Sequence, residues 1–230
     1  MRTFSVSEPK VGIFPQARSF PGAMRIGFWI CIFIAVAVVL RRVVALLHPS
    51  QSRPPQMAGL DAAFASHIAL TLAHILPALA FILLLALSYF PRFAHAAWLT
   101  RLLFPLGAIV GITAYAMSTY SVGGWIERSA VLFFNSLFLF ALIRAWLYMR
   151  GGEALLRQQW MTRAVAILLG IATTRPVMGI FFATSSLTHL TPRQFFGTAF
   201  WIGFSINTIA IELWLRSTNG RPSLETMAHK

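Results

Sequence analysis

The chain has 230 residues, of which 57% are hydrophobic and only 11% are charged, and its mean hydropathy is +0.71. Soluble domains carry about 25% charged residues, so this composition indicates a protein solvated largely by lipid. The net charge of +13 does not indicate nucleic-acid binding, because Lys and Arg punctuate the apolar runs and do not form one face. The single cysteine, Cys31, excludes an intrachain disulfide.

Six apolar runs are each long enough for a membrane-spanning helix, which needs about 20 residues. The predicted fold is therefore all-α: one six-helix transmembrane bundle over residues 25–216, between polar tails at 1–24 and 217–230. The spans are predicted at about 26–47, 63–90, 102–120, 129–148, 164–183 and 195–215. The start of the last span is well marked, because Thr191 can N-cap a helix and Pro192 suits its first position.

The distribution of basic residues predicts the orientation. With the N-terminus inside, 13 Lys and Arg lie on the inner side and 5 on the outer side, and Arg175 within a span completes the 19. The positive-inside rule then places both termini in the cytoplasm. The predicted location is the inner (cytoplasmic) membrane of a bacterium. The lipid bilayer is the expected partner, nucleic acid is not, and a homo-oligomer or a membrane-protein partner stays open.

Arg175 lies inside the fifth span, directly before Pro176. An arginine at this depth costs about 3 kcal/mol on insertion scales, so it usually faces protein or water and has a partner. Two interpretations are open. The guanidinium either bonds backbone carbonyls that Pro176 leaves free, holding the bundle together, or it faces a cavity where an anionic ligand supplies its counter-charge.

Four polar residues on four spans come out near mid-depth when each residue advances about 1.5 Å along its helix. These candidate ligand-binding residues are His74, Thr113, Arg175 and Asn207. No carboxylate is predicted at their level. Asp61 and Glu127 are placed at the solvated outer ends of their spans, and Glu212 lies near the inner end of the last span.

His67 and Glu212 are secondary candidates. His67, Thr71 and His74 share one face of the second span, and each histidine is interpreted as a hydrogen-bond partner of a Ser or Thr on a neighbouring helix. Haem is disfavoured, because the facing spans supply no second axial histidine, and the cofactor stays unknown. Glu212 is expected to pair with Arg163 or Arg157 at the inner surface.

No catalytic or metal-binding motif occurs: the chain has no phosphate-binding Gly loop and no GxSxG, HExxH or CxxC pattern. No catalytic or metal-ligating residue is therefore predicted, and an enzyme is the less favoured class. Gly107 and Gly111 have GxxxG spacing, which favours close helix packing within the bundle. Three functions stay open: binding or moving a small anionic or lipid-like ligand, an accessory or assembly subunit, and a membrane redox protein with haem or quinone.

The run RQQWMTR at 157–163 is similar to the His-Arg-Arg-Trp-Met-Ile-Arg stretch of the bacterial membrane-protein family filed as domain of unknown function 2306. Arg175 looks like that family's in-membrane arginine, and His74, the 95–101 stretch, the turn at 123–124 and the run ELWLR at 212–216 also resemble its pattern. The resemblance covers about residues 65–216. Two positions depart from it: Arg157 replaces a histidine, and Ala96 replaces an arginine. The resemblance implies the fold and the topology, and it carries no established activity.

Overall fold

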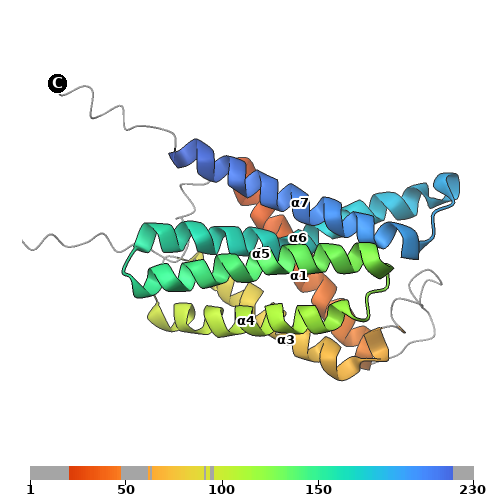
Figure 1. Cartoon of the computed structure of the whole chain (residues 1–230), viewed down its shortest axis with the longest axis horizontal. Helices are drawn as coiled ribbons and strands as arrows, with labels where there is room; N and C mark the ends of the chain where they lie inside the picture. The colour runs from red at the N-terminus through yellow and green to blue at the C-terminus, as the bar shows by residue number, and fades with distance from the viewer. Residues whose placement is uncertain (1–20, 48–61, 63, 91, 94–95, 220–230) are drawn as a thin grey trace, which may run out of the picture.

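The computed structural model describes residues 21–47, 62, 64–90, 92–93 and 96–219, and within them it contains six helices and no strand (Figure 1). The helices are α1 (Gly22–Leu47), α3 (Ile68–Ser88), α4 (Ala97–Ser118), α5 (Gly124–Arg150), α6 (Ala154–Thr188) and α7 (Pro192–Asn219). All six are long and apolar enough to cross a membrane. The predicted all-α bundle of six membrane-spanning helices is confirmed. Most of both predicted tails and the connection at 48–60 lie outside the described residues.

Several helices extend beyond the predicted spans, and α6 does so most. The prediction placed a span at 164–183 after a connection at 149–163, whereas α6 has 35 residues and the connection is only Gly151–Glu153. The chain breaks there because Gly152 adopts φ 77°, a left-handed conformation that glycine tolerates. Hydropathy marks the part of a helix in lipid, and α6, about 52 Å long, exceeds a hydrocarbon layer of about 30 Å. In contrast, α3 begins at Ile68, later than the predicted residue 63.

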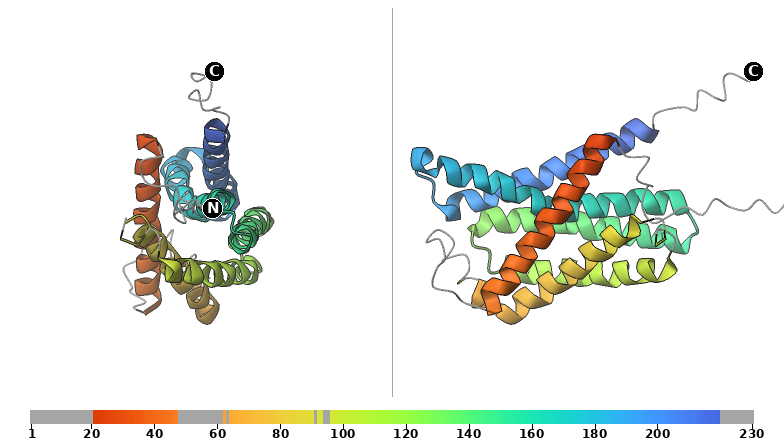
Figure 2. Two further views of the ribbon diagram at one scale, coloured as in Figure 1. Left: turned by 90° about the vertical axis from the view of Figure 1, so that its left-hand side faces the viewer. Right: turned by 180° about the vertical axis from the view of Figure 1, so that it is seen from behind.

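Five helices form a bundle in which α5 and α6 are central, and α1 lies across its side. Contacts join α3 with α4, α4 with α5, α5 with α6, and α7 with both α5 and α6. Helix α1 contacts α3 and α6 and runs diagonally over them (Figure 2). The core contains fully buried side chains from several helices, among them Phe81, Leu103, Met161 and Phe195.

Small residues let α4 and α5 pack closely. A Cβ atom added to Gly107 would lie 2.8 Å from Cδ2 of Leu142, and one added to Gly111 would meet Leu139. Asn135 Nδ2 donates a hydrogen bond of 2.9 Å to the carbonyl oxygen of Gly111, so α5 reaches the α4 backbone directly. The interpretation of the GxxxG spacing as packing within the bundle is confirmed.

The start of α7 also agrees with its prediction. The helix begins at Pro192, and the backbone N–H of Thr191 donates to Oε1 of Gln194 at 2.8 Å. The Thr191 hydroxyl lies 3.0 Å from the same oxygen. Gln194 therefore reaches back over the first turn, as the third residue of a capping box does.

The orientation of the bundle in the membrane stays a prediction. Reporter fusions after Arg53, Gly124 and His189 should report the outer side, because the basic residues concentrate on the opposite side. A fusion after Gly151, in the connection between α5 and α6, should report the cytoplasm and serves as the control. A cytoplasmic signal from the Gly124 fusion would contradict the predicted orientation.

Candidate functional site

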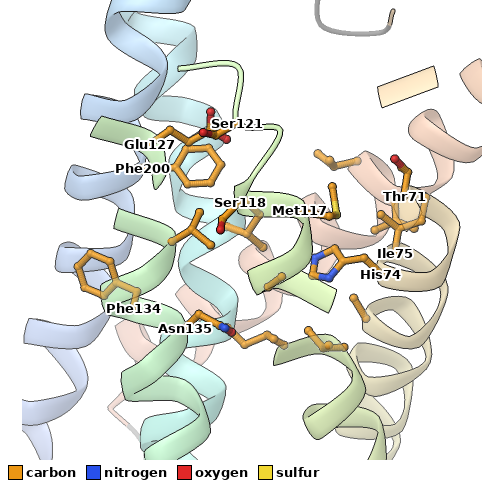
Figure 3. Close-up of a pocket in the computed structure, with 18 of the residues that line it drawn as sticks. Thr71, His74, Ile75, Met117, Ser118, Ser121, Glu127, Phe134, Asn135 and Phe200 are labelled. Carbon is orange, nitrogen blue, oxygen red and sulfur yellow. The ribbon is translucent and has the colours of Figure 1, made fainter. Parts of the chain in front are cut away.

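A cavity of about 240 Å³ lies inside the bundle and is lined by residues of all six helices (Figure 3). It lies toward the end of the bundle where α1, α4 and α6 finish and α3, α5 and α7 begin. Most of its wall is apolar and strongly aromatic. The phenylalanines that line it are Phe64, Phe134, Phe138, Phe196, Phe200 and Phe204.

Among the residues that the structure describes, three charged side chains line this cavity: Arg42 from α1, Glu127 from α5 and Arg175 from α6. Two are cationic and one is anionic, so the wall carries an excess of positive charge. The guanidinium of Arg42 also lies over the ring of Phe64, 4.1 Å from its centroid. Charged side chains within a largely aromatic cavity wall suit a ligand with an apolar body and a polar head.

Arg175 lines the cavity, and its Nε atom is buried with no hydrogen-bond partner among the described residues. Helix α6 continues through Pro176, and among the described residues the guanidinium forms no hydrogen bond to a carbonyl that this proline leaves free. Its electrostatic neighbours are the charges of Arg41, Arg42 and Glu127. The arrangement favours the cavity-facing interpretation of Arg175 over the interpretation in which it only holds helices together.

His74 lines the same cavity and is fixed by a residue of α4. Its Nδ1 lies 2.9 Å from Oγ1 of Thr113, whose hydroxyl donates to the carbonyl of Ile109 at 2.7 Å. The interpretation of His74 as the partner of a hydroxyl on a neighbouring helix is confirmed.

Asn207 is separated from this group. Its Oδ1 accepts a hydrogen bond from Thr173 at 2.8 Å, and its Nδ2 donates to the carbonyl of Ala166 at 3.2 Å. It therefore ties α7 to α6 and does not line the cavity. Depth along a helix does not fix the rotation of a residue about the helix axis, so Asn207 does not join the predicted group at the cavity, and Thr113 is linked to the cavity only through His74.

Glu127 is the residue that sequence reasoning misplaced. It was expected to be solvated at the end of its span, but only 7% of its surface is exposed and it lines the cavity. Its Oε2 accepts a hydrogen bond of 2.6 Å from the backbone N–H of Gly123. Asp61, placed at the same level by the prediction, lies outside the described residues.

Glycines explain how the first turn of α5 becomes covered. A Cβ atom on Gly197 of α7 would lie 2.5 Å from the backbone nitrogen of Glu127, so only glycine lets α7 approach so closely. A Cβ atom on Gly123 would likewise lie 2.9 Å from the nitrogen of Gly197. These two glycines are the signal in the sequence that could have indicated a buried Glu127.

The secondary candidates have different positions. His67 lines the cavity and stacks on the ring of Tyr120 with centroids 3.6 Å apart. Its Nδ1 lies 2.9 Å from the hydroxyl of Ser66, the adjacent residue, and not from a hydroxyl on a neighbouring helix as predicted. Glu212 lies away from the cavity and accepts bonds from Arg163 at 2.9 Å and Arg216 at 3.1 Å. The expected pairing of Glu212 with Arg163 is confirmed.

Replacing Glu127 by alanine should destabilise the protein by about 1–3 kcal/mol, because it leaves the buried N–H of Gly123 without an acceptor. Glu127→Gln keeps an oxygen at that position and should cost much less. Thermal unfolding in detergent measures both, with Glu153→Ala, an exposed carboxylate, as the control. Equal losses for the Gln and Ala variants would show that the charge of Glu127, and not its acceptor oxygen, is what the fold requires.

Among the described residues, the histidines that line the cavity are His67, at the start of α3, and His74 within α3, so these two do not offer haem ligands from facing helices. Within the described residues, no three His, Cys, Asp or Glu side chains are grouped as a metal site. The chemistry the cavity offers is therefore that of a guanidinium, a carboxylate and an imidazole against aromatic walls. Comparison of the chain with family models, curated proteins and solved structures finds no match.

Proposed function

We propose that this multi-pass membrane protein binds a small amphipathic anion, a carboxylate or phosphate with a short apolar body, in the cavity between its helices. The observation that supports this proposal is the position of Arg175. Its guanidinium lines a largely apolar cavity, and its buried Nε has no hydrogen-bond partner among the residues that the structure describes. A buried cation in such a wall is stabilised when a ligand supplies the counter-charge.

The head of the ligand is proposed to lie against Arg175 and Arg42, because a planar guanidinium can bind two oxygens of a carboxylate or phosphate at once. Glu127 repels an anion, so it positions the head away from its own corner of the cavity. The apolar body then contacts the phenylalanines of α5 and α7 that line the cavity, of which Figure 3 labels Phe134 and Phe200. The volume, about 240 Å³, is smaller than that of most drug-sized sites, so the body must be short.

Ligand-induced stabilisation tests the proposal. Octanoate, octyl phosphate and octanol share one alkyl chain and differ in the head group. Each compound is added to the full-length protein in a non-ionic detergent at increasing concentration, and the midpoint temperature of thermal unfolding is measured. A ligand that binds only the folded state raises the midpoint in proportion to the logarithm of its concentration. At least one of the two anions should raise the unfolding midpoint more than octanol does. Equal shifts for all three compounds would refute an anionic head, and the two anions compared with each other identify which head fits.

Membership in the family filed as domain of unknown function 2306, and a place in the inner membrane of a bacterium, are part of the same proposal. The run at 157–163, together with Arg175 and His74, supports the family. The structure adds that the latter two residues line one cavity. The cavity is compatible with binding and with moving the ligand across the membrane, and flux of octanoate into proteoliposomes separates these two activities.

A second candidate function, an accessory or assembly subunit, is favoured by a shallow apolar groove along α7. It is lined by Trp201, Ile202, Ser205, Ile206, Ile209, Ala210 and Leu213. Ile209 and Leu213 there are 58% and 64% exposed. Cross-linking through a photoreactive residue at position 209 in native membranes discriminates between the candidates: an adduct with another membrane protein supports the subunit, and adducts with lipid alone support the binding protein.

A further inference from the structure

A second feature, at the opposite end of the bundle from the cavity, is a group of aromatic rings and guanidinium groups between α5 and α6. The indole of Trp160 has the guanidinium carbon of Arg144 at 5.3 Å and that of Arg163 at 4.8 Å from its ring. Phe140 meets the same indole edge-on at 5.4 Å. The cluster of Phe140, Arg144, Tyr148, Trp160 and Arg163 is called the basic-aromatic cluster below.

The two arginines of this cluster differ in their counter-charges. Arg163 bonds Glu212 at 2.9 Å, and Glu212 also binds Arg216, so this carboxylate is already shared between two cations. Arg144 donates a hydrogen bond to the hydroxyl of Tyr148 and lies 4.9 Å from that ring. In the part of the chain that the structure describes, no carboxylate forms an ion pair with Arg144, so its positive charge is available to an external anion.

The depth of Arg144 suits the headgroup layer of a membrane. Helix α5 has 27 residues and is about 40 Å long, so roughly 5 Å extends beyond a hydrocarbon layer of about 30 Å at each end. Arg144 lies six residues before the end of the helix at Arg150, which puts its Cα about 4 Å inside the hydrocarbon boundary. A long arginine side chain can extend from there to the phosphate level.

The surface beside Arg144 is apolar and open, as an acyl chain requires. On α5, Phe140 is 52% exposed, Ile143 54% and Leu147 50%. A free phosphate ion gains nothing from these side chains, whereas the acyl chains of a phospholipid cover them. The surface therefore favours a lipid headgroup over a soluble anion as the occupant.

We propose that the basic-aromatic cluster is a binding site for an anionic phospholipid, in which Arg144 contacts the headgroup phosphate and the acyl chains lie along the exposed face of α5. Trp160 and Tyr148 hold the guanidinium in place by cation–π contacts and by the hydroxyl of Tyr148, so less conformational freedom is lost on binding. The site is independent of the cavity and of the function proposed for it.

The test compares lipid retention by the purified full chain, measured by native mass spectrometry in a non-ionic detergent. The chain is given equal amounts of phosphatidylglycerol and phosphatidylcholine, which share a phosphate and acyl chains but differ in net charge. Phosphatidylglycerol should be retained about fivefold more, the scale expected for one basic residue at an anionic membrane surface. Arg144→Gln should abolish this preference, and Arg144→Lys, which keeps the charge and loses the planar fork, should lower it.

Two controls make the result specific. Arg101→Gln removes an exposed arginine from α4 at the same end of the bundle and should keep the preference, as should Arg175→Met, which alters only the cavity. The proposal is overturned by equal retention of the two lipids in the parent chain, or by an equal loss in the Arg101 and Arg144 variants. Displacement of the lipid by excess inorganic phosphate would likewise overturn it, because the site would then bind the free ion.

Discussion

Replacing Gly170 by alanine should destabilise the bundle by about 1–3 kcal/mol, and valine at the same position should prevent stable folding. Gly170 lies where α6 packs against α7. An added Cβ atom would be 2.6 Å from Cδ1 of Phe204 and 2.9 Å from its Cα. The ring could rotate, but the Cα belongs to the α7 backbone, so the two helices must separate. Because Asn207 and Thr173 bond across the same interface, separation also weakens that hydrogen bond.

Gly179 is the matched control for this prediction. It lies on α6 as well, and a Cβ atom added there meets no atom within 4 Å. Gly179→Ala should be neutral or stabilising by about 0.5–1 kcal/mol, because alanine is the better residue within a helix. The midpoints of thermal unfolding in one detergent compare the variants. A Gly170→Ala protein as stable as the parent would show that α6 and α7 do not pack as closely as the structure has them.

The fold was largely predictable because lipid imposes a strong constraint on sequence. Each span must satisfy its backbone groups internally and present apolar side chains to the bilayer, so six apolar runs predicted six helices. The helix ends were less predictable, since a helix continues past the hydrocarbon boundary wherever its residues permit. Arg157 and Arg163 were interpreted as a connection for this reason, although they lie in the long α6.

The candidate site was predictable only in part. Energetics alone indicated that Arg175 should face protein, and the pairing of His74 with a hydroxyl followed from the cost of an unsatisfied imidazole in lipid. The sequence did not predict the rotation of Asn207 about its helix axis or the burial of Glu127. Both depend on which helix faces which, and the pattern along one span does not contain this information. Gly197, which lets α7 cover Glu127, lies 70 residues away in the chain.

Replacing Arg175 by methionine should leave the protein folded and abolish the stabilisation by an anionic ligand. Methionine fills much of the same volume without a charge, and it removes a buried guanidinium whose Nε has no hydrogen-bond partner among the described residues, so a desolvation cost is removed with it. Arg175→Lys keeps the charge but cannot bind two oxygens of one head, so the ligand-induced shift should shrink without vanishing. The readout is the rise in unfolding midpoint caused by octanoate or octyl phosphate, measured against octanol for each variant.

In the same ligand titration, Glu127→Gln should have the opposite effect to Arg175→Met. Glu127 and Arg175 line one cavity and their charges interact, so removing the anionic charge should strengthen binding of an anion while leaving the response to octanol unchanged. A gain of about tenfold in affinity corresponds to about 1.4 kcal/mol, a moderate value for one charge in a site screened from water. A helix-holding role for Arg175 predicts something else: neither substitution would then change the response to a ligand. If the two substitutions have opposite effects on anion binding and neither changes the response to octanol, the charge of the bound ligand interacts with both side chains.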